Sequence, residues 1–358
     1  MNLPAHGSNP QYLFNALNIP LPTNKLDFSA NINPLGPPPL LRENWEQLYE
    51  LVSDYPDPNG YKLKKLLAQR EGIEESQLLL GNGGAEIISL IGRLLAKKRV
   101  TIIQPTFTEY EEACLINGCT VTYHQLIPDN WELRIEDIKV KLQNSDALWL
   151  CNPCNPTGIY YSKSIMFELL IECQKQDCLL IIDEAFYDFL SNYESIVQYI
   201  KEYEHLLIIR SMTKMFAIPG LRLGYLMANQ SIIEQLSAFQ PQWSMNALAL
   251  KTGEWCLESE LYIEETRKLI EMERERLVCF YKEKEFIVSP SCVNFYLVRD
   301  RTMTNQMPFF QFLLEKGIIP RHTLNFPGLD GKWLRFAIKA PQHHNKLMEA
   351  VTEWRNRR

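Results

Sequence analysis

The chain contains the stretch Arg210-Ser211-Met212-Thr213-Lys214-Met215-Phe216-Ala217-Ile218-Pro219-Gly220-Leu221-Arg222-Leu223-Gly224-Tyr225, directly after the apolar run 206–209 that predicts a buried strand. Burial and nearby positive charge lower the pKa of a lysine such as Lys214, and a neutral amine is a nucleophile toward carbonyl groups. The hydroxyls of Ser211 and Thr213 and the guanidinium of Arg222 suit a phosphate. An amine that can form a Schiff base beside a phosphate site indicates pyridoxal phosphate (PLP). On this stretch alone, a solvated loop lysine is the alternative.

Short apolar runs alternate with helical segments outward from this stretch, at 100–104, 121–126, 147–150, 179–182 and 206–209. Such runs predict an α/β fold with a mostly parallel sheet that is covered on both faces. Phe107, Asn155, Asp183 and Lys214 each come just after a strand. Ligands of open α/β sheets bind at the carboxyl ends of the strands, so we expect these four residues to share one site.

A glycine-rich turn follows the apolar run 78–80, in the sequence Gly81-Asn82-Gly83-Gly84-Ala85-Glu86, and leads into an apolar helix at 87–95. Free amides and the helix dipole make such a helix start suitable for a phosphate, here at Gly84 and Ala85. The turn matches neither the dinucleotide fingerprint nor a P-loop, since the Gly-Lys-Ser/Thr ending is missing. A plain turn remains the alternative.

Asp183 ends an apolar strand, where an unpaired carboxylate would be costly to bury. A protonated pyridine nitrogen is a suitable partner and would keep a PLP ring able to accept electrons. A helix N-cap or a structural salt bridge is the alternative for Asp183. Phe107 could stack on a planar ring, although most aromatic residues after strands belong to the core.

The last third of the chain predicts a smaller α+β domain, with a long charged helix at 248–281, strands at 294–298 and 333–338, and helices at 308–316 and 343–358. Arg321 and Arg335 each stand in strand-like, apolar surroundings. Such an arginine usually pairs with a protein carboxylate. Two of them facing a cleft could instead bind a substrate carboxylate and a phosphate.

Residues 1–40 are rich in Pro, Asn and Gly, and we interpret them as an extended arm. His6-Gly7 and the run 27–36 put small residues beside side-chain donors, which suits an anion, although turns are the more frequent explanation. Helices are expected at 45–52 and 61–71. Cys151 and Cys154 form a C-x-x-C pair without a second pair at zinc spacing, so no metal site is expected.

The overall composition excludes several classes of protein. The 358 residues carry 37 Lys and Arg against 43 Asp and Glu, a net charge of −6, without a basic tract for nucleic acid. No apolar run is long enough to span a membrane, and the amino terminus shows no signal peptide. The nine scattered cysteines favour reduced thiols in the cytoplasm.

Several motifs in order resemble the fold type I PLP enzymes of the aspartate aminotransferase superfamily: Asn155-Pro156-Thr157-Gly158, Asp183-Glu184-Ala185-Phe186, Ser211-x-x-Lys214 and Gly220-Leu221-Arg222-x-Gly224-Tyr225. Further segments at 6–7, 27–36, 55–57, 81–83 and 243–247 resemble the members that decarboxylate L-threonine O-3-phosphate in cobalamin synthesis, relatives of histidinol-phosphate aminotransferases. The resemblance spans nearly the whole chain. It implies a homodimer with an arm (1–40) that joins the small domain, a large PLP-binding domain (41–250) and a small α+β domain (251–358).

The resemblance also implies roles for individual residues. Lys214 and Asp183 would be the catalytic residues, the first as the Schiff-base lysine and the second as the partner of the pyridine nitrogen. Asn155 would bond the ring hydroxyl, and Phe107 would stack on the ring. The cofactor phosphate would be bound by Gly84, Ala85, Ser211, Thr213, Arg222 and, from a second subunit, Tyr55. The substrate would be bound by His6, Gly7, Asn31, Asn155, Arg321 and Arg335, with Arg335 on its carboxylate.

Two departures from the family pattern bear on the reaction. Phe186 stands where aminotransferases usually have a tyrosine, which favours decarboxylation over amino transfer. Lys339 stands where an arginine is expected, and nothing in the sequence explains it. The expected product is (R)-1-aminopropan-2-yl phosphate with CO2. An aminotransferase acting on histidinol phosphate is the alternative, and a non-catalytic regulator is disfavoured by the acidic composition.

Overall fold

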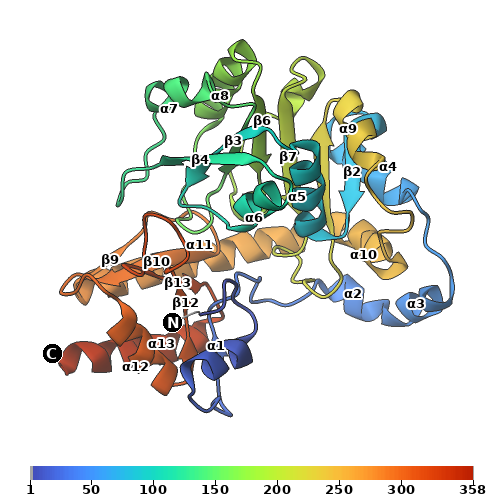
Figure 1. Ribbon diagram of the computed structural model, residues 1–358. Coiled ribbons are helices and arrows are strands. Elements are labelled where there is room, and N and C mark those ends of the chain that lie inside the picture. Colours follow the sequence, from blue (N-terminus) through green and yellow to red (C-terminus); the bar gives the residue numbers. More distant parts are fainter. Residues whose placement is uncertain (1–2, 358) are drawn as a thin grey trace.

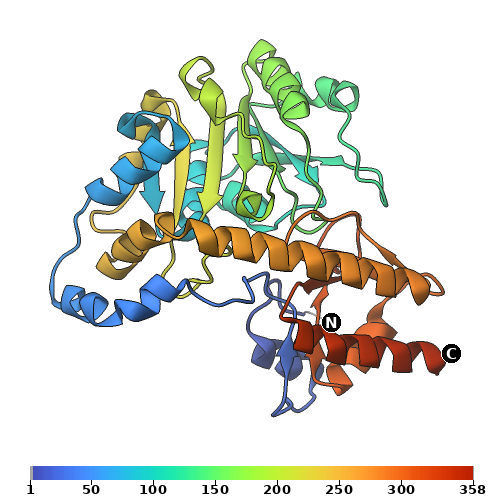
Figure 2. The same ribbon diagram turned by 180° about the vertical axis from the view of Figure 1, so that it is seen from behind.

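The computed structural model describes residues 3–357. Figure 1 shows a large sheet wrapped by helices, with a smaller body below it that contains both ends of the described chain. A long helix, α11 (Glu260–Glu283), runs beneath the large sheet into the smaller body, as the view from behind makes plain (Figure 2).

The large sheet has seven strands in the order β2-β8-β7-β6-β5-β3-β4. The strands are β2 (Leu78–Gly81), β3 (Arg99–Gln104), β4 (Thr120–Gln125), β5 (Ala147–Cys151), β6 (Leu179–Asp183), β7 (Leu206–Ser211) and β8 (Gly224–Ala228). Strand β8 pairs antiparallel with both of its neighbours, and the pairs from β7 to β4 are parallel. The prediction of a mostly parallel α/β sheet is therefore confirmed.

Both faces of this sheet are buried, and alternate residues of each strand point to opposite faces. On β5, Leu148 and Leu150 belong to one hydrophobic cluster and Trp149 to the other. The covering helices are α4 (Tyr61–Glu71), α5 (Gly83–Leu94), α6 (Glu109–Ile116), α7 (Ile135–Leu142), α8 (Lys163–Lys175) and α9 (Gln230–Ser237). Burial of both faces explains why the strands could be recognised as continuous apolar runs.

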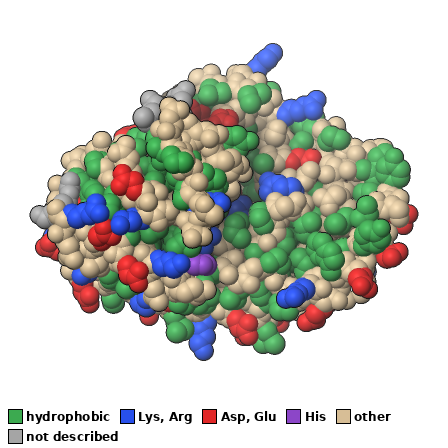
Figure 3. Space-filling model, turned by 90° about the horizontal axis from the view of Figure 1, so that it is seen from below, with side chains coloured by type: hydrophobic (Ala, Val, Ile, Leu, Met, Phe, Trp, Pro, Cys, Tyr) green, Lys and Arg blue, Asp and Glu red, His purple; other side chains and the backbone are tan. Residues whose placement is uncertain are grey.

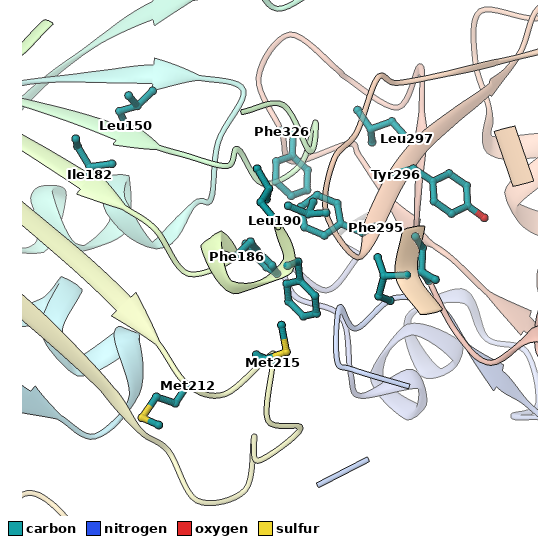
Figure 4. Packing of buried hydrophobic residues seen from close by; sticks show 14 of the residues in the cluster. Leu150, Ile182, Phe186, Leu190, Met212, Met215, Phe295, Tyr296, Leu297 and Phe326 are labelled. Atoms are coloured by element: carbon teal, nitrogen blue, oxygen red, sulfur yellow. The ribbon is translucent and has the colours of Figure 1, made fainter. Parts of the chain in front are cut away.

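The smaller body contains a four-stranded antiparallel sheet in the order β12-β13-β10-β9. Its elements are β9 (Phe286–Val288), β10 (Phe295–Asp300), α12 (Met307–Glu315), β12 (Arg321–His322), β13 (Leu334–Ala337) and α13 (Pro341–Asn356). Strand β1 (Leu26–Asp27) pairs in parallel with β11 (Ile318–Ile319), which attaches the amino-terminal segment to this body. Figure 4 shows the hydrophobic core continuing from Ile182 through Phe186 to Phe295.

Three predicted elements differ from the structure. The predicted helix 248–281 is two helices, α10 (Ala247–Leu257) and α11, because the Ser259 hydroxyl donates to the carbonyl of Trp255 and competes with the helical bonds. The predicted helix 45–52 is α3 (Trp45–Glu50) followed by a 3-10 turn. The last helix begins at Pro341, whose fixed φ suits a first helical position, and Arg358 lies outside the described residues.

The arm was predicted to be extended, yet it contains α1 (Pro10–Leu17). Pro10 opens this helix, and Leu13 and Phe14 bury its inner face. A short helix, α2 (Pro39–Glu43), follows the arm, and 3-10 turns occur at Glu75–Gln77, Tyr187–Phe189 and Val197–Lys201. None of the helices within residues 3–357 is both long and apolar enough to cross a membrane.

Candidate active site

A cavity of about 230 Å³ lies where the carboxyl ends of β5, β6 and β7 meet the arm and the small sheet. Its walls include all four residues that were expected there from their positions after strands: Phe107, Asn155, Asp183 and Lys214. From below, the molecule shows a central hollow with Lys or Arg side chains inside it (Figure 3). The topology of the parallel sheet thus brings together residues that are more than 100 positions apart in sequence.

Lys214 follows β7 and points its amine into this cavity. Its Nζ lies 3.5 Å from the Ser211 hydroxyl and 5.9 Å from the centre of the Phe186 ring. Burial lowers the pKa of Lys214, and the nearby charge of Arg222 lowers it further, while Asp183 opposes the shift. The lowered pKa therefore favours the neutral, nucleophilic form of this amine more than in a surface lysine.

Asp183 ends β6 with its carboxylate buried at the bottom of the cavity. One oxygen, Oδ1, accepts the backbone N–H of Ala185 at 2.9 Å. The other, Oδ2, accepts the hydroxyl of Tyr110 at 2.6 Å. Burial raises the pKa of Asp183, and the bonds from Tyr110 and Ala185 and the charge of Lys214 act against that rise.

An anion cradle adjoins Lys214 at the start of α5. A side chain at Gly83 would come within 2.6 Å of the Arg222 guanidinium, so the glycine lets Arg222 approach the helix start. Gly84 is the second residue of α5, where the backbone amide has no intrahelical partner, and a Cβ there would meet nothing within 4 Å. Arg222 has φ +60°, a left-handed conformation that costs about 1 kcal/mol for a residue other than glycine.

The cradle is completed from the β7–β8 pair. Ser211 and Gly224 are partners in that pair, and a Cβ at Gly224 would lie 3.0 Å from the amide nitrogen of Gly84. Thr213 is buried, and its hydroxyl lies 3.4 Å from the Leu223 carbonyl. The cradle residues Gly84, Ala85, Ser211, Thr213 and Arg222 lie beside the cavity rather than in its wall.

Arg321 and Arg335 are directly opposite each other on β12 and β13, and both line the cavity. Arg335 donates to the Asn155 side-chain oxygen and, at 2.8 Å, to the carbonyl of Ser29. Arg321 donates to the Ala5 carbonyl and, at 2.6 Å, to Asn325 Oδ1. Arg335 Nε and Arg321 Nη1 are buried without a hydrogen-bond partner among the described residues.

Burial disfavours the charged form of both arginines, and the charge of Arg321 disfavours that of Arg335 further. Burial lowers the pKa of Arg335 to about 9, with the charge of Arg321 as a second cause. Burial likewise lowers the pKa of Arg321 to about 10. Within residues 3–357, neither guanidinium forms an ion pair with a carboxylate.

The arm covers one side of the cavity with His6, Gly7 and Asn31. His6 Nε2 lies 3.0 Å from Glu109 Oε1, and its ring meets that of Phe107 edge-on at 5.8 Å. A Cβ at Gly7 would lie 2.6 Å from the Ser29 carbonyl oxygen, so only glycine fits at this position of the arm. The Asn31 side-chain oxygen is buried without a partner among the described residues.

Tyr55 lies neither in the cavity wall nor in the phosphate cradle of this chain. Its side chain is 84% exposed and packs against Trp243 with ring centres 5.2 Å apart. This exposed position is compatible with the prediction that Tyr55 acts from a second subunit, a prediction that a single chain does not test.

A family model for class I and II aminotransferases matches residues 23–353. The chain belongs to this family. It is 32% identical over 350 residues to threonine-phosphate decarboxylase of Salmonella typhimurium, an alignment covering 97% of this chain and 95% of the relative.

Two solved structures of this family are close to the whole chain. Histidinol-phosphate aminotransferase from Clostridium acetobutylicum superposes with a TM-score of 0.88 at 34% identity, over 93% of this chain and 100% of that one. L-threonine-O-3-phosphate decarboxylase from Porphyromonas gingivalis superposes with a TM-score of 0.81 at 25% identity, over 91% of this chain and 98% of that one.

Class I and II aminotransferases are PLP enzymes, and the residues of this site fit the cofactor. Lys214 offers an amine with a lowered pKa, and the buried carboxylate of Asp183 can face a ring nitrogen. The open amide of Gly84 beside Arg222 suits the phosphate group. The donor set therefore matches the aldehyde, pyridine and phosphate parts of PLP.

Sequence reasoning did not single out two residues that the structure places at the site. They are Tyr110, which bonds Asp183, and Glu109, which pairs with His6. Cys151, considered in the sequence only for a metal or redox pair with Cys154, lines the cavity. A signal existed for Tyr110, since it follows Phe107 by three residues, about one helical turn. The thiol of Cys151 lies 3.2 Å from the Pro153 carbonyl, and all nine cysteines are free.

Proposed function

We propose that the protein decarboxylates L-threonine O-3-phosphate to (R)-1-aminopropan-2-yl phosphate and CO2, with PLP as cofactor, in the synthesis of the cobalamin side chain. The name of the Salmonella relative and that of the Porphyromonas structure support this choice. The observation that carries it is the pair of buried guanidiniums in the cavity wall that have no carboxylate partner among the described residues.

Arg321 and Arg335 are cross-strand neighbours, a position in which like charges repel. The strain is relieved when an anionic ligand enters, because a carboxylate or phosphate accepts two parallel bonds from a guanidinium. L-threonine O-3-phosphate carries one carboxylate and one phosphate. The two arginines, with His6 and Asn31 nearby, provide donors for both groups.

Bound PLP supplies an electron sink for the cleavage of a bond to the α-carbon of an amino acid. Lys214 contributes the amine that holds the cofactor and can accept or return a proton at Nζ. Asp183 holds a proton on the ring nitrogen. Ser211, Thr213 and Arg222, with the amides of Gly84 and Ala85, bind the cofactor phosphate.

The remaining residues orient the substrate. Arg335 binds the carboxylate, and Arg321, His6 and Gly7 bind the phosphate at the other side of the cavity. Two fixed anions restrain rotation about the α-carbon, so the carboxylate can be held in the orientation that favours its loss. The aromatic walls formed by Phe107, Phe186 and Phe326 limit the access of water.

An aminotransferase acting on histidinol phosphate is the second candidate, because the Clostridium structure at 34% identity bears that name. Histidinol phosphate has a phosphate but no carboxylate, whereas its co-substrate 2-oxoglutarate has two carboxylates, so the arginine pair alone does not separate the two reactions. The aminotransferase tyrosine, however, is missing. Phe186 lines the cavity, whereas Tyr187 lies beneath it, with its ring 3.8 Å from the Arg210 guanidinium.

The proposal includes a cytoplasmic homodimer. Several large apolar side chains are exposed around Tyr55, which packs against Trp243, and we propose that a second copy of the chain covers them: Trp45, Tyr49, Val52, Tyr55 and Trp243. Tyr55 would then reach the phosphate cradle of the partner. We also propose the division into an arm (1–40), a large domain (41–250) and a small domain (251–358).

The test is an incubation of the PLP-loaded protein with L-threonine O-3-phosphate in the absence of any keto acid. Steady release of CO2 over many turnovers is expected. Amino transfer from histidinol phosphate to 2-oxoglutarate without CO2 release would overturn the proposal. As a control, borohydride should fix PLP to the wild-type protein and not to Lys214→Ala.

A further inference from the structure

A buried tyrosine contacts the proposed partner of the cofactor ring. The Tyr110 hydroxyl donates to Asp183 Oδ2 at 2.6 Å, a short bond of the kind that neutral donors make to carboxylates. Tyr110 has no solvent-exposed surface. It is neither a predicted site residue nor a part of the function proposed above.

The position of Tyr110 is fixed on several sides. It lies in the first turn of α6, and its ring stacks on Trp149 of β5, with centres 4.7 Å apart and planes 13° apart. Its other side meets the Phe107 ring edge-on at 5.8 Å. A hydroxyl on so constrained a ring has little freedom, so it can hold the Asp183 carboxylate in one orientation.

We propose that Tyr110 is a positioning residue, whose hydroxyl keeps Asp183 oriented and ionised so that Asp183 can hold a proton on the ring nitrogen of bound PLP. The inference rests on the cofactor part of the proposed function and is independent of the substrate. Phe107 and Tyr110, one turn apart, would thus act on the same cofactor ring, Phe107 by direct contact and Tyr110 through Asp183.

The groups around Asp183 explain why one hydroxyl matters. Burial is the largest influence on the pKa of Asp183 and raises it, while the Tyr110 hydroxyl is the first of the opposing influences. The other facing groups are the Ala185 amide, the Lys214 amine and the Cys151 thiol. Without the hydroxyl, the pKa of Asp183 would rise further, and Asp183 would compete more strongly with the ring nitrogen for the proton.

The first experiment compares the binding of two cofactors to the apoprotein. One is PLP, and the other is its carbocyclic analogue, in which CH replaces the ring nitrogen. Tyr110→Phe keeps the ring and removes the hydroxyl. We expect its affinity for PLP to fall about tenfold, as for the loss of one hydrogen bond to a charged group, and its affinity for the analogue to change less than about twofold.

The matched control is Tyr161→Phe. Tyr161 is also buried, and its hydroxyl donates to the Trp131 carbonyl at 2.7 Å, outside the cavity wall. This variant should bind both cofactors like the wild type. Equal losses for PLP and the analogue in Tyr110→Phe would show a structural role only and overturn the inference, as would unchanged binding of PLP.

A second readout reports the proton itself. PLP labelled with ¹⁵N in the ring gives an NMR shift that distinguishes a protonated from a neutral nitrogen. We expect a protonated nitrogen in the wild type and a shift toward the neutral value in Tyr110→Phe. Neither measurement involves a substrate, so failure of the decarboxylase assay would leave this inference standing, and an unmoved resonance would overturn it alone.

Discussion

Two arginines of this molecule are almost equally buried and yet have opposite surroundings. Arg210, 3% exposed, donates to Glu184 at 2.9 Å and to Glu71 at 2.5 Å. Arg335, 7% exposed, donates only to neutral oxygens, of Asn155 and Ser29, among the described residues. Arg210 has its counter-charges within the chain, and Arg335 has none among the described residues.

The pKa directions express the same difference. Burial lowers the pKa of Arg210, but the surrounding acidic groups outweigh burial and raise the pKa well above its usual value. Arg210 therefore remains charged. Burial lowers the pKa of Arg335 to about 9. A buried cation without a counter-ion costs free energy of folding, and proteins keep such groups mainly where a ligand supplies the missing charge. The comparison therefore supports the proposal that Arg210 stabilises the scaffold and Arg335 binds the ligand.

The largest effect on stability is expected for Arg210→Met. The change leaves the carboxylates of Glu71 and Glu184 buried without their cation, which should lower the free energy of unfolding by about 3–5 kcal/mol. Urea unfolding followed by tryptophan fluorescence measures it. Arg134→Met, at an exposed pair with Glu132, is the control and should unfold like the wild type. A loss as small as that of the control would refute the scaffold role.

We expect Arg335→Met to retain its stability and to lose activity, the opposite of Arg210→Met. The variant removes an uncompensated buried charge and its repulsion with Arg321, so unfolding in urea should occur at the same concentration as in the wild type or a higher one. The kcat/KM for L-threonine O-3-phosphate should fall about 100-fold or more, because the substrate carboxylate loses a buried partner. Full activity combined with lowered stability would reverse the assignment of the two arginines.

Arg321→Met tests whether Arg321 binds the phosphate of the substrate and not its carboxylate. Arg321 also holds the Ala5 carbonyl and Asn325, so part of its bonding is already satisfied and a smaller effect is expected. Binding of L-threonine O-3-phosphate should weaken about tenfold, while binding of L-threonine should change little. Calorimetric titration of both ligands measures this, and equal weakening of both would contradict a phosphate-binding role.

The strand-end residues of the site could be predicted from the sequence, whereas the difference between the arginines could not. Phe107, Asn155 and Asp183 follow apolar runs, and a parallel sheet places such ends at one edge. Arg210 and Arg335 both follow apolar strand residues, so the sequence around them is similar. Only the tertiary structure brings Glu71 of α4 to Arg210 and leaves Arg335 facing a cavity.

Two further differences have local causes. The helix α1 in the arm had a signal in Pro10 and the spacing of Leu13, Phe14 and Leu17, but the many Pro, Asn and Gly residues around it favoured extended chain.

Tyr110 could not be linked to Asp183 because the sequence does not say where α6 begins. A start one residue later would turn the Tyr110 side chain by about 100°.

The smallest effect concerns His6, a cation whose counter-ion lies beside the cavity rather than in the scaffold. The hydrogen bond to Glu109 raises the pKa of His6, with burial and Arg321 opposing and the charges of Glu109 and Glu112 assisting. A raised pKa means that protonated His6 contributes fully below its unfolded-state pKa and that this contribution is lost as the pH rises through the folded-state value. The same deprotonation removes a positive charge from the cavity, so affinity for L-threonine O-3-phosphate should also decrease as the pH rises through the folded-state pKa of His6.

Glu109→Gln isolates this contribution, because it lowers the pKa of His6 without touching the cavity wall. Its affinity should fall at a lower pH than that of the wild type, and the difference at one intermediate pH should be about threefold, since both groups are partly exposed. Titration of the substrate phosphate affects both proteins equally and cancels in the ratio. If the ratio of the wild-type affinity to the variant affinity does not vary with pH, His6 has a structural role, as Arg210 has. It would then hold the arm in place and not bind the ligand.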